Sequence, residues 1–371
     1  MSAIGYPDPV QEAQHGSGRS SLAIGIMAGD DIGLEITPVV VDLMSAAADK
    51  AGLKIDWREI PIGRKALDSH GHTMPEGTLV ALSSLDGWVL GPIGHRLYPK
   101  VPEAINPHPI IRRHFDMFCG IKPFKSYPGV PCIRPDVDLV FLRENNEGFQ
   151  PDRNMFLGKG EFRPTEDVTI SVRVITRRQS SRICRAAFEV ARRRRKKVTA
   201  VHKDTVFKLS CGMFAEEFRR LAQDYPDVEA EEMMVDTFAH DIILKPTRFD
   251  VVVTTNMYGD ILTDEAAALV GGLGMAPGIA VAPKHIMAQA THGSAPDIAG
   301  KGLANPFALL QSGTMMLDVL GTRLGLAAAR EAARLLNAAV EGSIGDPASR
   351  TGDVGGTAST TEMGKRIKAR I

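Results

Sequence analysis

The chain has 371 residues, which is more than one hydrophobic core usually organises, so two domains are expected. Its 44 Lys and Arg residues balance 44 Asp and Glu residues, which removes any general electrostatic case for nucleic acid or an anionic membrane as a partner. The four cysteines lie far apart without a CxxC pair, which argues against a zinc cluster or a disulfide framework and favours a reduced, cytoplasmic protein.

The sequence shows neither a membrane anchor nor a signal peptide. No apolar stretch approaches the roughly 18 residues that a membrane helix needs, and residues 1–20 lack a basic start followed by an apolar run. Because that first segment is rich in Gly, Ser, Pro and Gln, we expect a disordered leader over residues 1–20.

Short apolar runs alternate with helical patterns along most of the chain, which is typical of an α/β fold with a parallel or mixed sheet. Strands are predicted at residues 22–27, 87–90, 138–142, 168–175, 198–202 and 250–254. Helices are predicted to start after Gly33, near Ser180, near Gly212, after Gly259, at Pro306 and at Thr322. No GxGxxG sequence stands between a strand and a helix, so any NAD must bind without the Rossmann fingerprint.

Two stretches depart from this alternation. Residues 143–169 are rich in Pro, Gly, Asn and charge, which predicts an excursion from the core. Residues 192–197 read Arg-Arg-Arg-Arg-Lys-Lys and invite a nucleic-acid interpretation. Because cations favour the C-terminal end of a helix and a buried strand follows at once, we interpret the run as a solvated helix end.

The most informative stretch is residues 256–264, Asn-Met-Tyr-Gly-Asp-Ile-Leu-Thr-Asp, which follows an apolar strand and opens a helix. Asp260 and Asp264 are four residues apart, so both carboxylates project from one helix face, as a hard cation with oxygen ligands requires. A capping aspartate with a solvated neighbour is the simpler alternative. Asp236 precedes another predicted helix in an apolar setting. It could be the third carboxylate that a metal site needs, or simply the N-cap of that helix.

A long loop of small residues spans positions 292–305, His-Gly-Ser-Ala-Pro-Asp-Ile-Ala-Gly-Lys-Gly-Leu-Ala-Asn. Its backbone amides could approach phosphate closely, and Asp297 could accept hydrogen bonds from ribose hydroxyls while repelling a 2′-phosphate. A plain connecting loop is the alternative interpretation.

Together and in this order, these two blocks resemble the isocitrate and isopropylmalate dehydrogenase family of β-decarboxylating dehydrogenases, from about Ile24 to the C-terminus. Residues 29–35, Gly-Asp-Asp-Ile-Gly-Leu-Glu, resemble the family's GDGIGPE turn beside the cofactor, with Asp31 in place of a glycine. The resemblance implies a two-domain, isopropylmalate dehydrogenase-like architecture. Residues 21–118 and 272–371 would form the large cofactor-binding domain, and residues 119–271 a small domain with the metal and catalytic residues and the dimer interface.

By position, the resemblance implies a Mg2+ or Mn2+ site formed by Asp260 and Asp264 with the partner subunit's Asp236. Lys203 matches the family's catalytic lysine, which also crosses the dimer interface and acts together with Asp236. Arg112 and Arg143 match two arginines that grip the substrate carboxylates, a task suited to the planar guanidinium. Taken one at a time, such residues are ordinarily surface or ion-pair residues.

The resemblance also implies which residues hold the cofactor. An acidic residue followed by an apolar one at positions 297 and 298 favours NAD over NADP by the family's rule. The implied cofactor-binding residues are His292, Gly293, Ser294, Ala295, Asp297, Ile298, Asn305 and Thr205.

Three departures from the family's pattern lie at the substrate end. Gln150 stands where the family has a tyrosine that helps to protonate the enol, and glutamine is a poor acid. An arginine expected about seven residues before Arg112 is missing from the segment 104–109. Asp204 and Thr205 replace a pair that usually includes an asparagine. His95 or His108 could compensate, since histidine suits proton transfer near neutral pH, although a surface histidine is the simpler interpretation of either.

The leading hypothesis is therefore a homodimeric, NAD- and Mg2+- or Mn2+-dependent oxidative decarboxylase of a malate-like 2-hydroxy acid. 3-Isopropylmalate, isocitrate, D-malate and tartrate all remain open as substrates, as do the choice of metal and any assembly beyond the dimer. The alternative is a catalytically weak or regulatory paralogue that keeps the metal and nucleotide sites. Gln150 and the missing arginine favour this alternative, whereas Lys203 and the three aspartates oppose it.

Overall fold

A computed structural model describes residues 19–149, 158 and 160–371 of the chain. The strands of its main sheet are β1 (Ser21–Met27), β2 (Lys54–Glu59), β3 (Gly87–Leu90), β4 (Cys119–Lys125), β5 (Asp138–Glu144), β8 (Lys197–His202), β9 (Glu229–Met234), β10 (Val251–Thr254), β11 (Ile279–Val281) and β12 (Ile286–Ala288). The helices are α1 (Gly33–Ala51), α2 (Gly63–His70), α3 (Thr78–Ser83), α4 (Pro107–His114), α5 (Arg177–Arg192), α6 (Ser210–Ala222), α7 (Val235–Leu244), α8 (Asn256–Leu269), α9 (Phe307–Arg323), α10 (Ala327–Ile344) and α11 (Thr360–Lys368).

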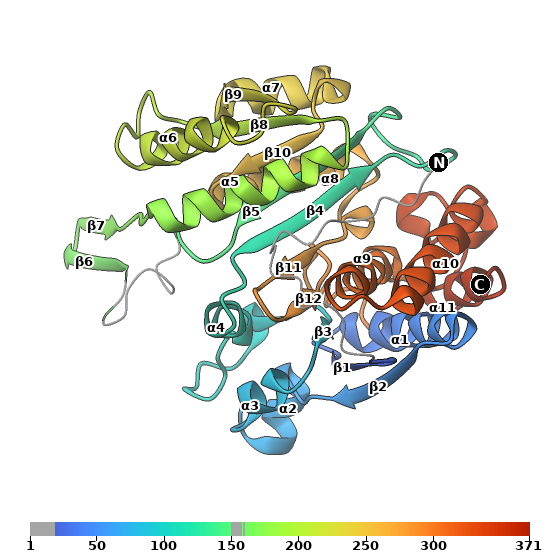
Figure 1. The fold of residues 1–371 in the computed structure, drawn as a ribbon. Helices are drawn as coiled ribbons and strands as arrows, with labels where there is room; N and C mark the ends of the chain where they lie inside the picture. Colours follow the sequence, from blue (N-terminus) through green and yellow to red (C-terminus); the bar gives the residue numbers. More distant parts are fainter. Residues whose placement is uncertain (1–18, 150–157, 159) are drawn as a thin grey trace.

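The ten strands form one mixed sheet in the order β2-β1-β3-β12-β11-β4-β5-β10-β8-β9 (Figure 1). Pairing is parallel from β2 to β12 and from β5 to β9, and the two runs are joined through the antiparallel strands β11 and β4. Helix α5 lies in front of the sheet in Figure 1 and α8 behind it. The predicted α/β class with a mixed sheet is thus confirmed.

The junction between β11 and β4 coincides with the division expected from the sequence. Every strand on the β2 side of this junction comes from outside residues 119–271, and every strand on the β9 side comes from within them. The independence of the two halves as domains stays a prediction.

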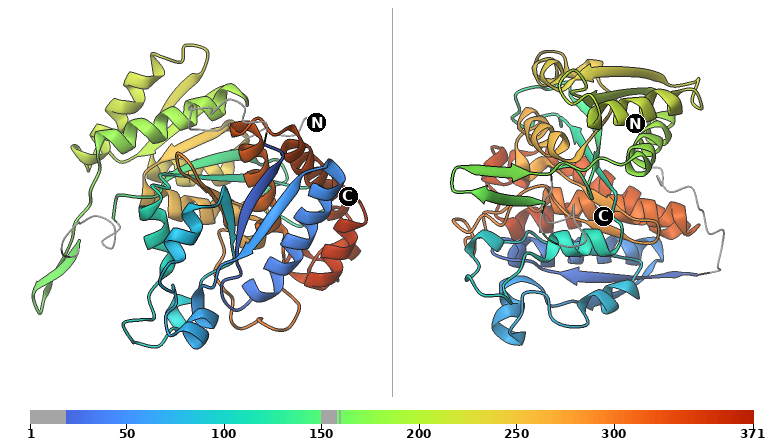
Figure 2. Two further views of the ribbon diagram at one scale, coloured as in Figure 1. Left: turned by 60° about the horizontal axis from the view of Figure 1, so that its bottom comes forward. Right: turned by 90° about the vertical axis from the view of Figure 1, so that its left-hand side faces the viewer.

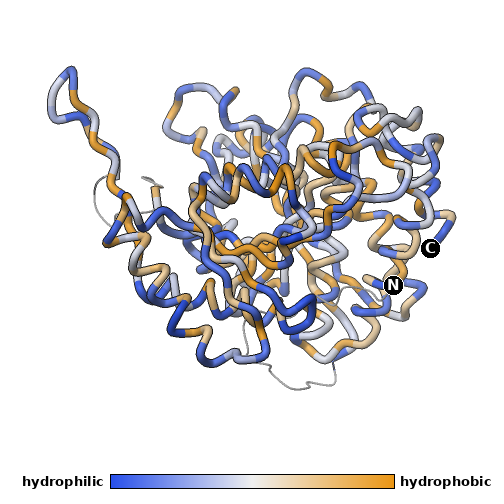
Figure 3. Tube along the Cα trace, turned by 90° about the horizontal axis from the view of Figure 1, so that it is seen from above, coloured by the Kyte–Doolittle hydropathy of each residue, from blue (hydrophilic) through white to orange (hydrophobic). Residues whose placement is uncertain are grey.

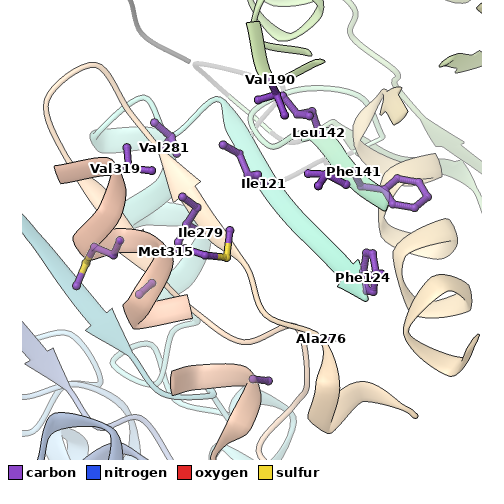
Figure 4. Close-up of a cluster of buried hydrophobic side chains, with 14 of the residues drawn as sticks. Ile121, Phe124, Phe141, Leu142, Val190, Ala276, Ile279, Val281, Met315 and Val319 are labelled. Carbon is purple, nitrogen blue, oxygen red and sulfur yellow. The ribbon is translucent and has the colours of Figure 1, made fainter. Parts of the chain in front are cut away.

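The core is continuous across this junction. Figure 4 shows Ile121 of β4 and Leu142 of β5 on one side, facing Ile279 of β11 and Met315 of α9 on the other. These side chains are fully or almost fully buried, and each such side chain contributes about 1.5–3 kcal/mol to folding. Figure 3 shows the hydrophobic stretches concentrated in the middle of the molecule, with hydrophilic stretches toward its outside.

Most predicted helices and strands are confirmed, but some of their predicted ends differ from the structure. The strand predicted at residues 168–175 ends at Ser171 as β7 (Val168–Ser171). The helix predicted to start at Thr322 was wrong, because α9 continues to Arg323 and α10 begins at Ala327. Between them Gly325 adopts a φ of 67°, a left-handed conformation that suits glycine and separates the two helices.

The predicted excursion contains a two-stranded antiparallel hairpin of β6 (Glu161–Thr165) and β7. The hairpin projects from the body of the molecule (Figures 1 and 2), and every residue of both strands is exposed. A two-stranded hairpin without a packed face is marginally stable in water, so this arm is suited to packing against another surface. Residues 150–157 and 159 of the excursion, Gln150 included, lie outside the described residues.

The expected leader falls almost entirely outside the described residues, which begin at residue 19. Arg19 itself forms a bidentate ion pair with Asp86, just before β3. Within the described part of the chain, no helix combines the length and hydropathy needed to cross a membrane.

The basic run at residues 192–197 is only partly the solvated helix end that its sequence predicts. Arg192 pairs with Asp227 at the surface, but Arg194 turns inward to Asp250, with Nε and Oδ1 2.7 Å apart. The side chains of Arg194 and Asp250 are only 5% and 2% exposed, and Asp250 also accepts the amide N–H of Arg195 at 2.7 Å. The run therefore anchors the end of α5 to the strand β10.

Replacement of Asp250 by alanine should destabilise the protein by up to about 3–5 kcal/mol, because the buried guanidinium of Arg194 would keep only the half-exposed Asp138, 2.7 Å away, as its counter-charge. Asp227→Ala removes the exposed partner of Arg192 and should change stability by less than about 1 kcal/mol. Urea denaturation followed by circular dichroism measures both variants. Equal losses in the two variants would contradict a structural role for the buried pair.

Candidate active site

The aspartates of the 256–264 block lie on α8, which begins directly after the buried strand β10. The predicted start after Gly259 was wrong, because α8 already begins at Asn256, so the whole block lies within the helix. Asp260 and Asp264 are one turn apart and both are exposed. Residues four apart in a helix lie on the same face, so the prediction that the two carboxylates share one helix face is confirmed.

Arg143, at the end of β5, meets Asp260 directly. Its Nη1 forms an ion pair with Asp260, and its Nε and Nη2 donate to the side-chain oxygen of Asn256 at 3.2 and 2.7 Å. The Arg143 side chain is only 6% exposed, and its burial lowers the pKa of the guanidinium while Asp260 opposes that shift. Gly259 permits this approach, because a Cβ at position 259 would lie 2.6 Å from the Cγ of Arg143.

Lys122, on β4, is a buried cation in the same group that the sequence analysis missed. In the antiparallel register Gly120 pairs with Arg143 and Lys122 with Phe141, so Lys122 and Arg143 project from the same face of the sheet. The Nζ of Lys122 donates to the hydroxyl of Thr263 on α8 at 3.0 Å. Burial, followed by the charge of Arg143, lowers the pKa of Lys122 to about 7.

Arg112 completes the cationic side of the site. It lies in the last turn of α4, and its Nη2 is 3.4 Å from the side-chain oxygen of Gln289. Its charge also lowers the pKa of Lys122, whereas the charges of Asp260 and Asp264 raise it. Partial burial raises the pKa of Asp264, with Lys122 opposing that shift. The site thus combines Arg112, Lys122 and Arg143 with two carboxylates.

Lys203 and Asp236 form a second group. Lys203 follows β8, Asp236 lies in the first turn of α7, and the Lys203 Nζ is 2.6 Å from the Asp236 Oδ1. This hydrogen bond lowers the pKa of Asp236, whose side chain is 66% exposed. Over the described ranges, no three His, Cys, Asp or Glu side chains of the single chain come close enough to hold a metal ion. A triad of Asp236, Asp260 and Asp264 therefore stays a prediction that requires a second subunit.

The turn at residues 29–35 packs against the predicted cofactor loop. The N–H of Ile32 donates to the carbonyl of Ser294 at 3.2 Å. Buried Asp30 holds the turn by accepting from the amides of Arg64 and Gly94 and from the hydroxyl of Tyr98, at 2.6, 2.7 and 2.5 Å. Burial and this bond raise the pKa of Tyr98. Asp31 has a φ of 50°, which its side chain tolerates less readily than the glycine that the family pattern places there.

The loop at 292–305 has room for a polar ligand along its backbone. Ideal Cβ atoms at Gly293, Gly300 and Gly302 would meet nothing within 4 Å. His292 donates from Nδ1 to the carbonyl of Gly293 at 3.0 Å, while its Nε2 is buried without a hydrogen-bond partner among the residues that the structure describes. The loop thus has an open glycine-rich backbone beside a buried nitrogen that makes no hydrogen bond to the described residues.

The remaining predicted cofactor residues differ in their availability. Asp297 and Gly293 are exposed, Ser294 is buried, and Ala295 and Ile298 pack against the core. Asn305 is already used within the protein, since its Nδ2 donates to Asp353 at 3.0 Å and its Oδ1 accepts from the amide of Phe307 at 2.9 Å.

Thr205 belongs to the Lys203 group within one chain. It lies exposed after β8, with its Oγ1 3.7 Å from the sulfur of Met234, the residue before α7. Of the two histidines considered as compensating acids, His95 is exposed and His108 lies in the first turn of α4, the helix that carries Arg112.

Comparison with known proteins gives a consistent identification. The model of the family described as isocitrate/isopropylmalate dehydrogenase matches residues 23–367. The 3-isopropylmalate dehydrogenase of Methanothermobacter thermautotrophicus is 36% identical over 352 residues, which cover 95% of this chain and 99% of that protein. The isocitrate/homoisocitrate dehydrogenase of Thermus thermophilus is 38% identical over 338 residues, covering 91% and 95%.

A solved structure agrees in fold as well as in sequence. The crystal structure of isocitrate dehydrogenase from Methylococcus capsulatus superposes with a TM-score of 0.80 at 34% identity and covers 94% of this chain and 99% of that one. The match extends over both halves of the sheet and over both groups of site residues. The chain belongs to the isocitrate/isopropylmalate dehydrogenase family and is a decarboxylating dehydrogenase.

Proposed function

We propose that this enzyme catalyses the NAD- and Mg2+- or Mn2+-dependent oxidative decarboxylation of a malate-like 2-hydroxy acid with a carboxylate on C3. The observation that carries this proposal is the group of Arg112, Lys122 and Arg143 beside Asp260 and Asp264. Lys122 and Arg143 are buried cations, whereas Asp260 and Asp264 are exposed on α8, where they can face a metal ion. Such a site recognises a substrate that brings carboxylates of its own.

Lys122 is proposed to supply part of the substrate grip for which the sequence pattern lacks an arginine. Its ammonium group is buried between Arg143 and α8, so a carboxylate bound there would meet a cation shielded from water. An ammonium is a point charge and gives less directional binding than a guanidinium fork. The substrate would therefore be held by two arginines with defined geometry and by one lysine whose charge depends on pH.

Asp260 and Asp264, with the partner subunit's Asp236, are proposed to hold the divalent cation. Carboxylate oxygens are the ligands that Mg2+ and Mn2+ prefer, and both carboxylates of α8 are exposed. A bound divalent cation would stabilise the alkoxide as hydride leaves C2, and the enolate after loss of CO2. Arg143 pairs with Asp260 and orients its carboxylate.

Lys203 is proposed as the proton-transfer residue of the neighbouring subunit's site. Asp236 holds the Lys203 ammonium at 2.6 Å and thereby fixes its direction. Both side chains are partly exposed within one chain, which suits residues that complete a site across an interface. Two exposed apolar side chains, Val206 and Leu209, lie three and six residues after Lys203 and would gain by burial in such an interface.

The projecting hairpin supports the proposed homodimer. Phe162 of β6 and Val168 and Ile170 of β7 are exposed, although apolar side chains on an unsupported hairpin gain stability only by burial. We propose that residues 119–271 form the small domain that builds the dimer, and that residues 21–118 and 272–371 form the large domain that holds NAD.

NAD is proposed to bind along the loop at 292–305. Its open glycines and the buried Nε2 of His292 support this placement. The exposed carboxylate of Asp297 would accept hydrogen bonds from ribose hydroxyls and repel the extra phosphate of NADP. NAD would serve as the hydride acceptor at C4 of its nicotinamide ring.

Purified enzyme supplied with Mn2+ and NAD should form NADH with at least one acid from a panel of 3-isopropylmalate, isocitrate, homoisocitrate, D-malate and tartrate. NADH absorbance and released CO2 are measured together, because the proposed reaction yields both in equal amounts. NAD binding without turnover of any acid would instead support a catalytically weak paralogue. Oxidation without release of CO2 would contradict the decarboxylation step.

Equal amounts of the inactive variants Lys203→Met and Asp260→Asn should regain activity when their subunits are mixed by unfolding and refolding. If each site takes Lys203 from the partner, random pairing restores one of the two sites in half of the dimers, so about a quarter of wild-type activity returns. Each variant refolded alone is the control. No recovery, with mixed dimers demonstrated by differently tagged subunits, would contradict sites shared between subunits.

Because the pKa of Lys122 is about 7, its ammonium group loses its proton as pH rises through 7. The KM for the hydroxy acid should therefore rise with pH above about 7, by up to about tenfold per pH unit. Lys122→Arg keeps the charge and should flatten this rise, whereas Lys122→Met should raise KM below about pH 7 and approach the wild-type KM at high pH. Initial rates from about pH 6 to pH 9 test this expectation. Identical pH profiles for wild type and Lys122→Arg would contradict it.

A further inference from the structure

Glu35, in the first turn of α1, is hydrogen-bonded to the far end of the predicted cofactor loop. One carboxylate oxygen accepts the amide N–H of Gly300, and the other accepts the amide N–H of Gly302 at 2.8 Å. The two residues are separated from Glu35 by more than 260 positions in the sequence, so the contact joins the start of the chain to the loop. Both oxygens of one carboxylate are thereby committed to loop backbone.

The two glycines have little else to define their conformation. Their φ angles are 76° and 66°, and no atom lies within 4 Å of an ideal Cβ at either position. The loop has other contacts on either side of these glycines: Ile32 donates to the carbonyl of Ser294 at 3.2 Å, Ala295 and Ile298 pack against the core, and Thr360 donates to the carbonyls of Gly302 and Ala304 at 2.8 and 2.6 Å. Between these contacts, the carboxylate of Glu35 accepts the backbone N–H groups of Gly300 and Gly302.

A charged acceptor at this position has a further physical advantage. Hydrogen bonds to a carboxylate are stronger than those to a neutral acceptor, although partial exposure, as at Glu35, weakens them. A carboxylate in the first turn is also favoured by the dipole of α1. Holding the loop before the nucleotide arrives lowers the entropy lost on binding.

We infer that Glu35 is a positioning residue that presets the loop at 292–305 for the nucleotide. The inference rests on the proposed function for the identity of the nucleotide, but the hold on the loop is a property of the free protein. Glu35 acts through the loop, because each of its oxygens accepts a loop amide.

Glu35→Gln tests the inference with almost no change in size, since the amide offers one acceptor oxygen where the carboxylate offers two. Hydrogen exchange is measured in nucleotide-free protein. We expect peptides covering residues 295–303 to exchange about tenfold faster in Glu35→Gln, with the rest of the protein unchanged. Glu331→Gln is the matched control, because Glu331 lies on α10 and pairs at the surface with Arg334. Unchanged exchange in Glu35→Gln would overturn the inference.

Binding and kinetics give the second readout. The Kd for NAD from calorimetry, and the KM for NAD, should rise about tenfold in Glu35→Gln. The kcat and the KM for the hydroxy acid should stay within about twofold, and Glu35→Asp should recover part of the affinity. A fall in kcat together with similar rises in both KM values would overturn the inference, because it would indicate a general structural role for Glu35. Wild-type protein that binds no NAD would overturn the proposed cofactor, and exchange of the loop would still decide the role of Glu35.

Discussion

The buried guanidinium of Arg143 is the constraint around which the site is built. A cation removed from water needs acceptors and a counter-charge close by, and α8 supplies them from Asn256 and Asp260. The start of α8, the small residue at 259 and the end of β5 must therefore fit together. The same requirement sets the direction in which the carboxylate of Asp260 is presented.

The group around Arg143 and the loop at 292–305 are held by different kinds of interaction. At the predicted substrate end, burial and then the charges of Arg143 and Arg112 lower the pKa of Lys122, so like charges lie close together there. At the predicted cofactor end, Asp30 accepts from the amides of Arg64 and Gly94, and Glu35 accepts from the loop amides of Gly300 and Gly302. The first group favours an anionic ligand, and the second restrains the backbone around the loop.

The sequence predicted what depends on local spacing and failed where distant strands decide. The α/β class, the position of α8 and the common helix of Asp260 and Asp264 follow from periodicity over a few residues. Lys122 was missed because one lysine in an apolar run has no pattern, and only the register of β4 against β5 places it beside Arg143. β11 and β12 were missed because three residues are too few to show alternation. The burial of Arg194 depends on Asp250, which is 56 residues away.

The close contact at Gly259 restricts which residue can occupy this position. A methyl group there would occupy the space of the Arg143 side chain, so any other amino acid at 259 would force the guanidinium out of its seat on Asn256. A chain with a larger residue at this position would therefore have to hold the arginine of β5 in another conformation, and α8 would lose one of its contacts with that strand.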